Sequence, residues 1–155
     1  MEGEGRPVIR RMGKKHIPEV ARLERECFSE PWSEQAVGAE LENQQAVVFV
    51  AELDGELVGY AGLHFVMGEG YITNIAVASR FRHRGIGRAL LQAQKNFCIR
   101  RGFSMLTLEV RESNATAIGL YTSEGFSIVG KRRDFYKNPK EDGLIMTCFF
   151  QTDGQ

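Results

Sequence analysis

A short basic segment that contains two glycines, Arg82–Arg88, constrains this chain more than any other stretch. It lies between an apolar run at 71–77, which predicts a strand, and a helical pattern at 89–101. Gly85 and Gly87 let the backbone turn sharply and come close to a ligand. A helix begins with unpaired N–H groups and the positive end of its dipole. The order of strand, glycine loop and helix is therefore typical of a phosphate-binding site, and the arginines would strengthen the binding of a phosphate. A plain turn with solvated arginines explains the segment equally well on its own.

Two common nucleotide-binding loops do not fit this segment. A nucleoside-triphosphate loop ends in Gly-Lys followed by Ser or Thr, whereas Arg88 and Ala89 follow Gly87 here. A dinucleotide-binding loop needs a third glycine at position 90, which is Leu90. The pattern that remains, Arg-x-x-Gly-x-Gly, has to be interpreted together with the rest of the chain.

The composition predicts one globular domain that binds neither nucleic acid nor a membrane. The chain has 155 residues, 43% of them hydrophobic, and its 20 basic and 20 acidic residues cancel. We expect a single domain over 1–155 with flexible tails at 1–6 and 151–155, and no signal-peptide core. The cysteines Cys27, Cys98 and Cys148 lie too far apart for a metal or redox motif. They predict buried free thiols in a cytoplasmic protein, and no metal site is expected.

The hydrophobic periodicity predicts an α+β (mixed α/β) fold with a mostly antiparallel sheet and helices on both faces. Strands are expected at 7–12, 46–53, 56–67, 70–77, 104–110, 126–132 and 144–150. Helices are expected at 14–27, 33–42, 85–101 and 114–124. The last two strands are predicted to be joined by a connection at 134–143. Gly59 and Gly62 inside one strand indicate a bulge or a close backbone approach.

Two residues in the second half of the chain are candidates for proton transfer. Alternation along 105–110 puts Leu106 and Leu108 on one face of a strand and Glu109 on the other. A carboxylate at that position points into a cleft or forms a structural ion pair. Tyr121 lies on the next helix, on the same stripe as Asn114. An ordinary half-buried tyrosine is the alternative for this residue.

Taken together, these motifs resemble the GNAT family of acyl-CoA-dependent N-acetyltransferases. The resemblance rests on Arg-x-x-Gly-x-Gly at 82–87 and on Asn-x-x-Ala-x-x-x-Tyr-x-x-x-Gly-Phe at 114–126, and the order of elements agrees over nearly the whole chain. Pro-Trp-Ser at 31–33, Asn-Ile-Ala-Val at 74–77 and Leu-Glu-Val-Arg at 108–111 resemble its RimI branch. That branch acetylates the α-amine of protein N-termini, in bacteria that of a small-subunit ribosomal protein.

The resemblance implies a central sheet of about seven strands that is splayed in the middle to admit acetyl-CoA as cosubstrate. It implies that the loop at 83–88 wraps the pyrophosphate of the coenzyme and that the strand containing 75–77 pairs with its pantetheine arm. It also implies that the N–H of Val77 donates to the thioester oxygen as that oxygen gains charge. Glu109 is implied as general base, directly or through water, and Tyr121 as general acid. The residues implied to bind the coenzyme are Ile75, Ala76, Val77, Arg82, His83, Arg84, Gly85, Ile86, Gly87, Arg88, Asn114, Ala117 and Tyr121.

The amine substrate is implied to contact Pro31, Trp32, Asn74 and Tyr136. Relatives in this branch often carry two tyrosines where this chain has Phe135 and Tyr136, which is a departure from the pattern. An α-amine has an ordinary pKa near ~8 and a lysine near ~10.4, so freeing the lysine amine at neutral pH costs roughly 3 kcal/mol more. This favours a protein N-terminus. A lysine, a small-molecule amine or a non-catalytic acyl-CoA-binding role remain alternatives, and the oligomeric state is open.

Overall fold

The computed structural model describes residues 5–151 of the chain. Most of the two predicted flexible tails, 1–4 and 152–155, lies outside the described residues. The chain forms two compact units. The first unit comprises the chain up to His64 together with Thr73–Gln94, and the second comprises Phe65–Ile72 together with the chain from Lys95 onward. Among the described residues, no helix has both the length and the apolar character needed to cross a membrane.

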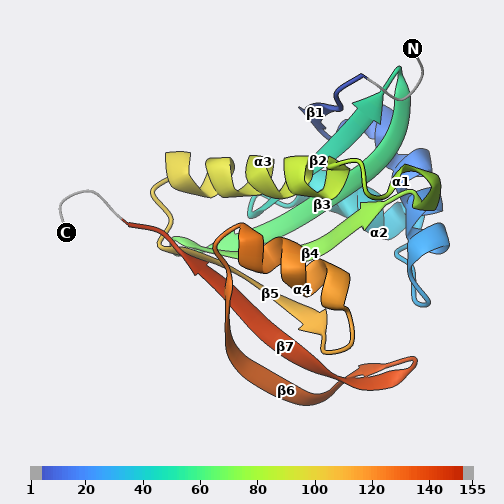
Figure 1. The fold of residues 1–155 in the computed structure, drawn as a ribbon. Helices are drawn as coiled ribbons and strands as arrows, with labels where there is room; N and C mark the ends of the chain where they lie inside the picture. The colour runs from blue at the N-terminus through green and yellow to red at the C-terminus, as the bar shows by residue number, and fades with distance from the viewer. Residues whose placement is uncertain (1–4, 152–155) are drawn as a thin grey trace. The chain divides into compact units, whose positions relative to one another are not determined.

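The structure confirms a mixed, mostly antiparallel sheet with four α-helices. The strands are β1 (Val8–Arg11), β2 (Ala46–Leu53), β3 (Glu56–Val66), β4 (Glu69–Val77), β5 (Met105–Arg111), β6 (Ser127–Lys137) and β7 (Lys140–Phe149). The helices are α1 (Ile17–Cys27), α2 (Glu34–Glu42), α3 (Ile86–Arg100) and α4 (Ala115–Ser123), with short 3-10 turns at Lys14–His16 and Ser79–Phe81. The strand order is β1-β2-β3-β4-β5-β7-β6 (Figure 1). β4 and β5 are parallel, and their ladder covers only Glu69–Tyr71 and Met105–Thr107.

In the first unit, helices cover both faces of the strands (Figure 1). Val50 on β2 packs into one apolar cluster with residues of α1 and α2. Ala51, the next residue, packs into a second cluster with Ile86 and Leu90 of α3. Successive strand residues point to opposite faces, so one strand serves both clusters. The close backbone approach predicted at Gly59 is confirmed, because a Cβ there would lie 3.0 Å from the carbonyl oxygen of Ala76.

In the second unit, β5 pairs with β7, and β6 pairs with the other edge of β7. The alternation predicted along β5 is confirmed, since Leu106 and Leu108 are buried and Glu109 lies on the other face. The connection predicted at 134–143 is wrong. Both strands continue through it and turn at Asn138–Pro139.

The residue types in that segment account for the error. Nearly all of β6 is exposed, so no alternating hydrophobic pattern marks it as a strand. Asp134, at φ +55, sits within a register shift between Arg132 and Tyr136, and such a residue is typical of a turn. Here it forms a bulge inside a strand instead.

Candidate functional site

The glycine loop of the first unit connects β4 to α3. After β4 the chain makes a 3-10 turn at Ser79–Phe81 and then loops into α3. His83 and Gly85 adopt positive φ, at 65° and 82°, and the carbonyl of Gly85 accepts the N–H of Ala89 at 3.0 Å to begin the helix. Gly85 therefore makes the turn, whereas Gly87 already lies in the first turn of α3. The unpaired N–H groups of this helix end are suited to an anionic ligand.

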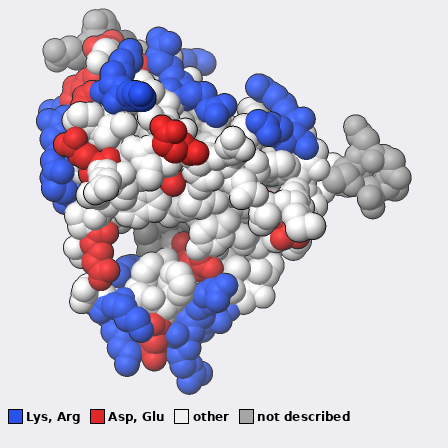
Figure 2. All heavy atoms as spheres, turned by 180° about the vertical axis from the view of Figure 1, so that it is seen from behind, with Lys and Arg blue, Asp and Glu red and all other residues white. Residues whose placement is uncertain are grey.

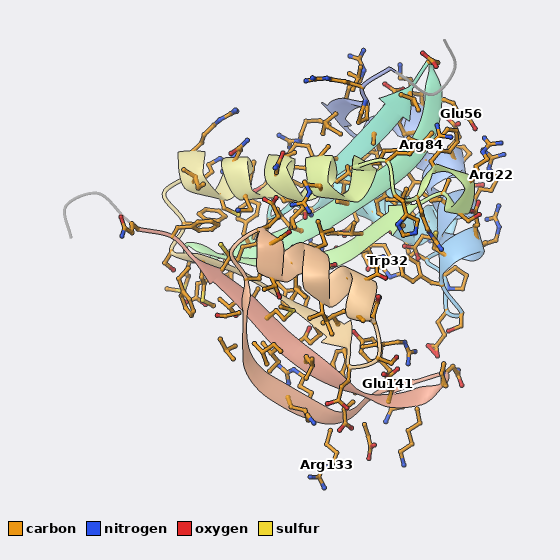
Figure 3. The ribbon with its side chains drawn as sticks, in the orientation of Figure 1. Arg22, Trp32, Glu56, Arg84, Arg133 and Glu141 are labelled. Atoms are coloured by element: carbon orange, nitrogen blue, oxygen red, sulfur yellow. The ribbon has the colours of Figure 1, made fainter. Side chains whose placement is uncertain are left out.

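The loop arginines have different surroundings. Arg82 donates through Nε to the carbonyl of Val77 at 3.2 Å and through Nη2 to the sulfur of Cys27 at 3.5 Å. It therefore ties the loop to the end of β4 and to α1. Arg84 lies over the ring of Phe81 with its guanidinium carbon 5.3 Å from the centroid, and it is exposed (Figure 3). Of these two, Arg84 is the one with its guanidinium available to a phosphate.

The end of β4 is fixed against β3 and α3. Ala76 is buried, while Ile75 and Val77 are half-buried and pack against the α3 cluster. The N–H of Ala78 donates to the carbonyl of Val58 on β3 at 2.8 Å. Because Gly59 has no side chain, β3, β4 and α3 approach closely at this point. The three residues predicted to line the pantetheine arm are thus held on a rigid strand.

Two predicted substrate residues of the first unit, Trp32 and Asn74, donate to one carboxylate. Glu24 on α1 accepts the backbone N–H of Trp32 at 2.8 Å and the side-chain amide of Asn74 at 2.6 Å. Trp32 is half-buried against the α1–α2 cluster, and Pro31 is exposed (Figure 3). Sequence reasoning missed Glu24. Its signal was a charged residue four positions after Val20, on the buried stripe of the helix.

In the second unit, Glu109 is held by two side chains. Its Oε1 accepts from the hydroxyl of Tyr71, and its Oε2 accepts from Nε of Arg132 at 2.8 Å. The Glu109 side chain is 6% exposed and that of Arg132 is 55% exposed. Burial, and after it the bond to Glu109, raises the pKa of Tyr71 above its ordinary value. Neither partner of Glu109 was predicted, although the ion pair with Arg132 matches one of the two alternatives expected for this carboxylate.

Helix α4 carries the predicted acid. Asn114 caps this helix, because its side chain accepts the N–H of Ala117 at 3.1 Å. Tyr121, one turn beyond Ala117, is half-buried with its ring 5.8 Å from that of Phe126. Burial, with a smaller effect of Tyr136, raises the pKa of Tyr121 to about 12. The phenol therefore stays protonated at neutral pH, as a proton donor requires.

Tyr136 on β6 belongs to the same unit as Glu109. Burial, and then the charge of Glu109, raises the pKa of Tyr136 to about 12. The guanidinium of Arg111 lies 4.3 Å from the centroid of its ring, and Phe135 packs edge-on at 5.0 Å. The second unit thus brings Glu109, Tyr71, Arg132 and Tyr136 into one electrostatic group.

Charged side chains of both signs lie on the surface. In the view of Figure 2, Lys and Arg side chains lie mostly towards the top and the bottom, with Asp and Glu among them, and much of the middle is uncharged. Several charged side chains of the described residues form ion pairs near the surface, such as Arg10 with Glu52 at 2.7 Å and Lys131 with Glu112 at 2.7 Å. Such pairs contribute little to stability.

Comparisons with known proteins give a consistent result. Residues 17–126 match the family model described as Acetyltransferase (GNAT) family. A protein of Bacillus subtilis (strain 168), provisionally named as a [ribosomal protein bS18]-alanine N-acetyltransferase, is 37% identical over 139 residues, which cover 89% of this chain and 92% of that protein. The [ribosomal protein bS18]-alanine N-acetyltransferase of Escherichia coli (strain K12) is 34% identical over 132 residues, covering 84% and 88%.

A solved structure agrees with these relatives over almost the full length. The crystal structure of the ribosomal-protein-S18-alanine N-acetyltransferase from Escherichia coli superposes with a TM-score of 0.88 at 31% identity. The match covers 97% of each chain.

Proposed function

This chain belongs to the GNAT family of acetyl-CoA-dependent N-acetyltransferases, and from that premise we propose that its acceptor is the α-amine of a protein N-terminus. The substrate we propose is the N-terminal alanine of a small-subunit ribosomal protein. One observation carries this proposal: relatives at 34% and 37% identity that are named for this reaction match the chain over 84% and 89% of its length.

The first unit is proposed to bind acetyl-CoA through the glycine loop. The start of α3 offers backbone N–H groups, and Gly59 allows the close packing that fixes β4 beside it. Arg84 would add a charge-assisted bond to a phosphate. The N–H of Val77 is proposed to donate to the thioester oxygen as that oxygen gains charge. Acetyl-CoA itself supplies the activated acyl group, so the chain needs no nucleophile of its own.

The second unit is proposed to move the protons. Glu109 accepts a proton from the incoming amine, directly or through water, and Tyr121 donates one to the departing thiolate. Each Glu109 oxygen already accepts one hydrogen bond and keeps a second lone pair for an incoming donor. Substrate entry is proposed to weaken the ion pair with Arg132, because that side chain is 55% exposed and water can replace Glu109 as its partner.

The chemistry of the amine supports an N-terminal substrate over lysine. At neutral pH an α-amine with a pKa near ~8 is about one-tenth free base, whereas a lysine near ~10.4 is far less so. A carboxylate is a weak base and works best on an amine that is already partly deprotonated. This argument favours the α-amine without needing any shift in the pKa of the substrate.

Two peptides test the proposal. The first begins with a free alanine and contains no lysine, and the second has the same sequence with an acetylated N-terminus and one internal lysine. We expect acetyl-CoA-dependent release of free thiol with the first peptide, at a kcat/KM at least about a hundredfold higher than with the second. Equal or faster use of the lysine peptide would exclude the N-terminal assignment. The role of the proposed base is tested separately by the Glu109→Gln variant. Its matched control is Glu112→Gln, since Glu112 is an exposed glutamate paired with Lys131.

A further inference from the structure

A buried carboxylate that the proposed chemistry does not use lies in the first unit. Glu24 is 1% exposed. Its Oε1 accepts the N–H of Trp32, and its Oε2 accepts from both the hydroxyl of Tyr60 and the amide of Asn74. Within residues 5–151, Glu24 has no ion pair. A buried carboxylate without a cation is costly unless donors surround it, so these three donors hold Glu24 in its place.

Glu24 determines which way the amide of Asn74 faces. An ionised carboxylate only accepts hydrogen bonds, so Asn74 has to turn Nδ2 towards it. The same Nδ2 lies 2.8 Å from the hydroxyl oxygen of Tyr60, which accepts from Asn74 while it donates to Glu24. Burial, followed by the charge of Glu24, raises the pKa of Tyr60, so this hydroxyl keeps its proton. The hydrogen bonds among Glu24, Tyr60 and Asn74 are therefore all formed with one orientation of the Asn74 amide.

This orientation leaves the carbonyl oxygen of Asn74 free. Over the described part of the chain, Oδ1 of Asn74 has no hydrogen-bond partner, and it is not among the buried unpaired atoms, so solvent reaches it. Asn74 is half-buried near the middle of β4, just before the residues predicted to line the coenzyme. An exposed acceptor on a rigid strand is suited to an N–H donor of a ligand.

The same carboxylate also fixes the turn that carries Trp32. Residues 28–33 form neither helix nor strand, and the backbone of Trp32 is held by Glu24 while its ring packs against the α1–α2 cluster. One side chain on α1 therefore controls two residues of the predicted substrate site. These two residues are far apart in the sequence.

We infer that Glu24 is a positioning residue for the amine substrate: it orients Asn74 so that Oδ1 accepts an N–H of the substrate's first residue, and it holds Trp32 as a wall of the same site. The inference rests on the proposed function, because it assigns these residues to the peptide side of the reaction. A free α-amine and the first peptide N–H are both donors of the required kind.

The Glu24→Gln variant tests this inference. Glutamine has nearly the shape of glutamate, but its Nε2 is a donor and conflicts with Nδ2 of Asn74. Asn74 then turns over and presents a donor to the substrate. We expect the KM for the alanine peptide to rise about tenfold, while the KM for acetyl-CoA stays within about twofold. Glu19→Gln, the same change on the same helix, is the matched control and should leave both constants unchanged.

A double variant that exchanges the hydrogen-bond donor and acceptor between positions 24 and 74 tests whether peptide binding can be restored. In the double variant Glu24→Gln with Asn74→Asp, the glutamine donates and the aspartate accepts, so the second aspartate oxygen again faces the substrate as an acceptor. We expect the peptide KM to return to within about threefold of the wild type. A merely structural role of Glu24 predicts no such recovery of KM, and a double variant as impaired as Glu24→Gln would overturn the inference.

Fluorescence adds a readout that does not depend on activity. Trp32 is the only tryptophan of the chain, so acrylamide quenching reports on its turn directly. We expect stronger quenching in Glu24→Gln than in Glu19→Gln. Increased quenching with an unchanged peptide KM would show that the turn does not govern substrate binding and would overturn the inference.

Two further outcomes remain distinguishable. If Glu24→Gln does not fold, Asn74→Ala decides, because it removes the acceptor directly; an unchanged peptide KM in that variant refutes the assignment. If the wild-type protein acetylates no peptide α-amine, the proposed function fails first. If the wild type is active and the variants match it, only the inference fails.

Discussion

The packing at Gly59 predicts a variant that links stability to coenzyme binding. In Gly59→Ala the new Cβ would lie 3.0 Å from the carbonyl oxygen of Ala76 and 3.2 Å from side-chain carbons of Ile86 and Leu90. Overpacking of this kind costs about 1–3 kcal/mol. Replacing glycine in a strand returns about 0.5–1 kcal/mol, because alanine has less freedom in the unfolded chain. The net destabilisation is therefore about 1–2 kcal/mol.

Two measurements follow from that estimate. For a chain of this size, 1 kcal/mol lowers Tm by about 2–4 °C, so we expect a fall of about 3–6 °C in a thermal melt. The displaced atoms belong to β4 and to the first turns of α3, so the KM for acetyl-CoA should also rise, by about three- to tenfold. Both effects have one cause and should appear together.

The matched control is Gly119→Ala. Gly119 lies inside α4, and a Cβ there meets nothing within 4 Å. Alanine is favoured over glycine in a helix by about 1 kcal/mol, so this variant should melt about 2–4 °C higher with an unchanged KM for acetyl-CoA. If Gly59→Ala melts and binds acetyl-CoA like the wild type, the close approach of β3, β4 and α3 does not support the coenzyme site.

Three other predictions concern the proposed site. Glu109→Gln and Tyr121→Phe should each lower kcat by about a hundredfold or more, with acetyl-CoA binding retained in calorimetry; unchanged turnover in both would remove the proton-transfer roles. Because burial raises the pKa of Tyr121 to about 12, kcat should not fall between about pH 9 and pH 10.5, where an ordinary tyrosine with a pKa near ~10 would lose its proton. A decline of kcat in that range that is absent from Tyr121→Phe would contradict this. Gly87→Trp places an indole in the first turn of α3 and should weaken acetyl-CoA binding at least about tenfold, and an unaltered Kd would argue against the loop as the pyrophosphate site.

The sequence predicted the parts of the fold that depend on local patterns. The alternation of Leu106, Leu108 and Glu109 placed the carboxylate on the correct face of β5, because one side of that strand is buried. The start of α2 is another local feature, since the side chain of Ser33 accepts the N–H of Ala36 at 3.1 Å and caps the helix close to the predicted position 33. Such features depend on neighbours a few residues apart, which the sequence displays directly.

The extent of β6 and β7 could not be predicted, for a physical reason. β6 forms an edge of the sheet, so its residues alternate between two solvated faces and carry no hydrophobic period. Asp134 and Pro139 are typical turn residues, and only Pro139 lies in the turn. Pairing with β7, rather than local preference, decides where this strand ends.

The polar contacts of the proposed site also could not be predicted from the sequence. Glu24 and Asn74 are 50 positions apart, and Arg132 and Glu109 are 23 apart, so no local pattern links either pair. Arg132 carries no local signal of its role, and it is the ion-pair partner of Glu109. Arg133, the next residue, extends away from the hairpin and is exposed (Figure 3). Two adjacent arginines differ in role only because the strand alternates.

The central claim, acetylation of an N-terminal α-amine, is tested most directly by one peptide that offers both amines. The peptide begins with a free alanine, contains one internal lysine and is incubated with acetyl-CoA and a small amount of the protein until about a tenth is converted. Fragmentation in a mass spectrometer then locates the acetyl group. The proposal predicts that at least about nine-tenths of it lies on the alanine nitrogen at neutral pH. Acetyl groups mainly on the lysine, or shared equally between the two amines, would contradict it.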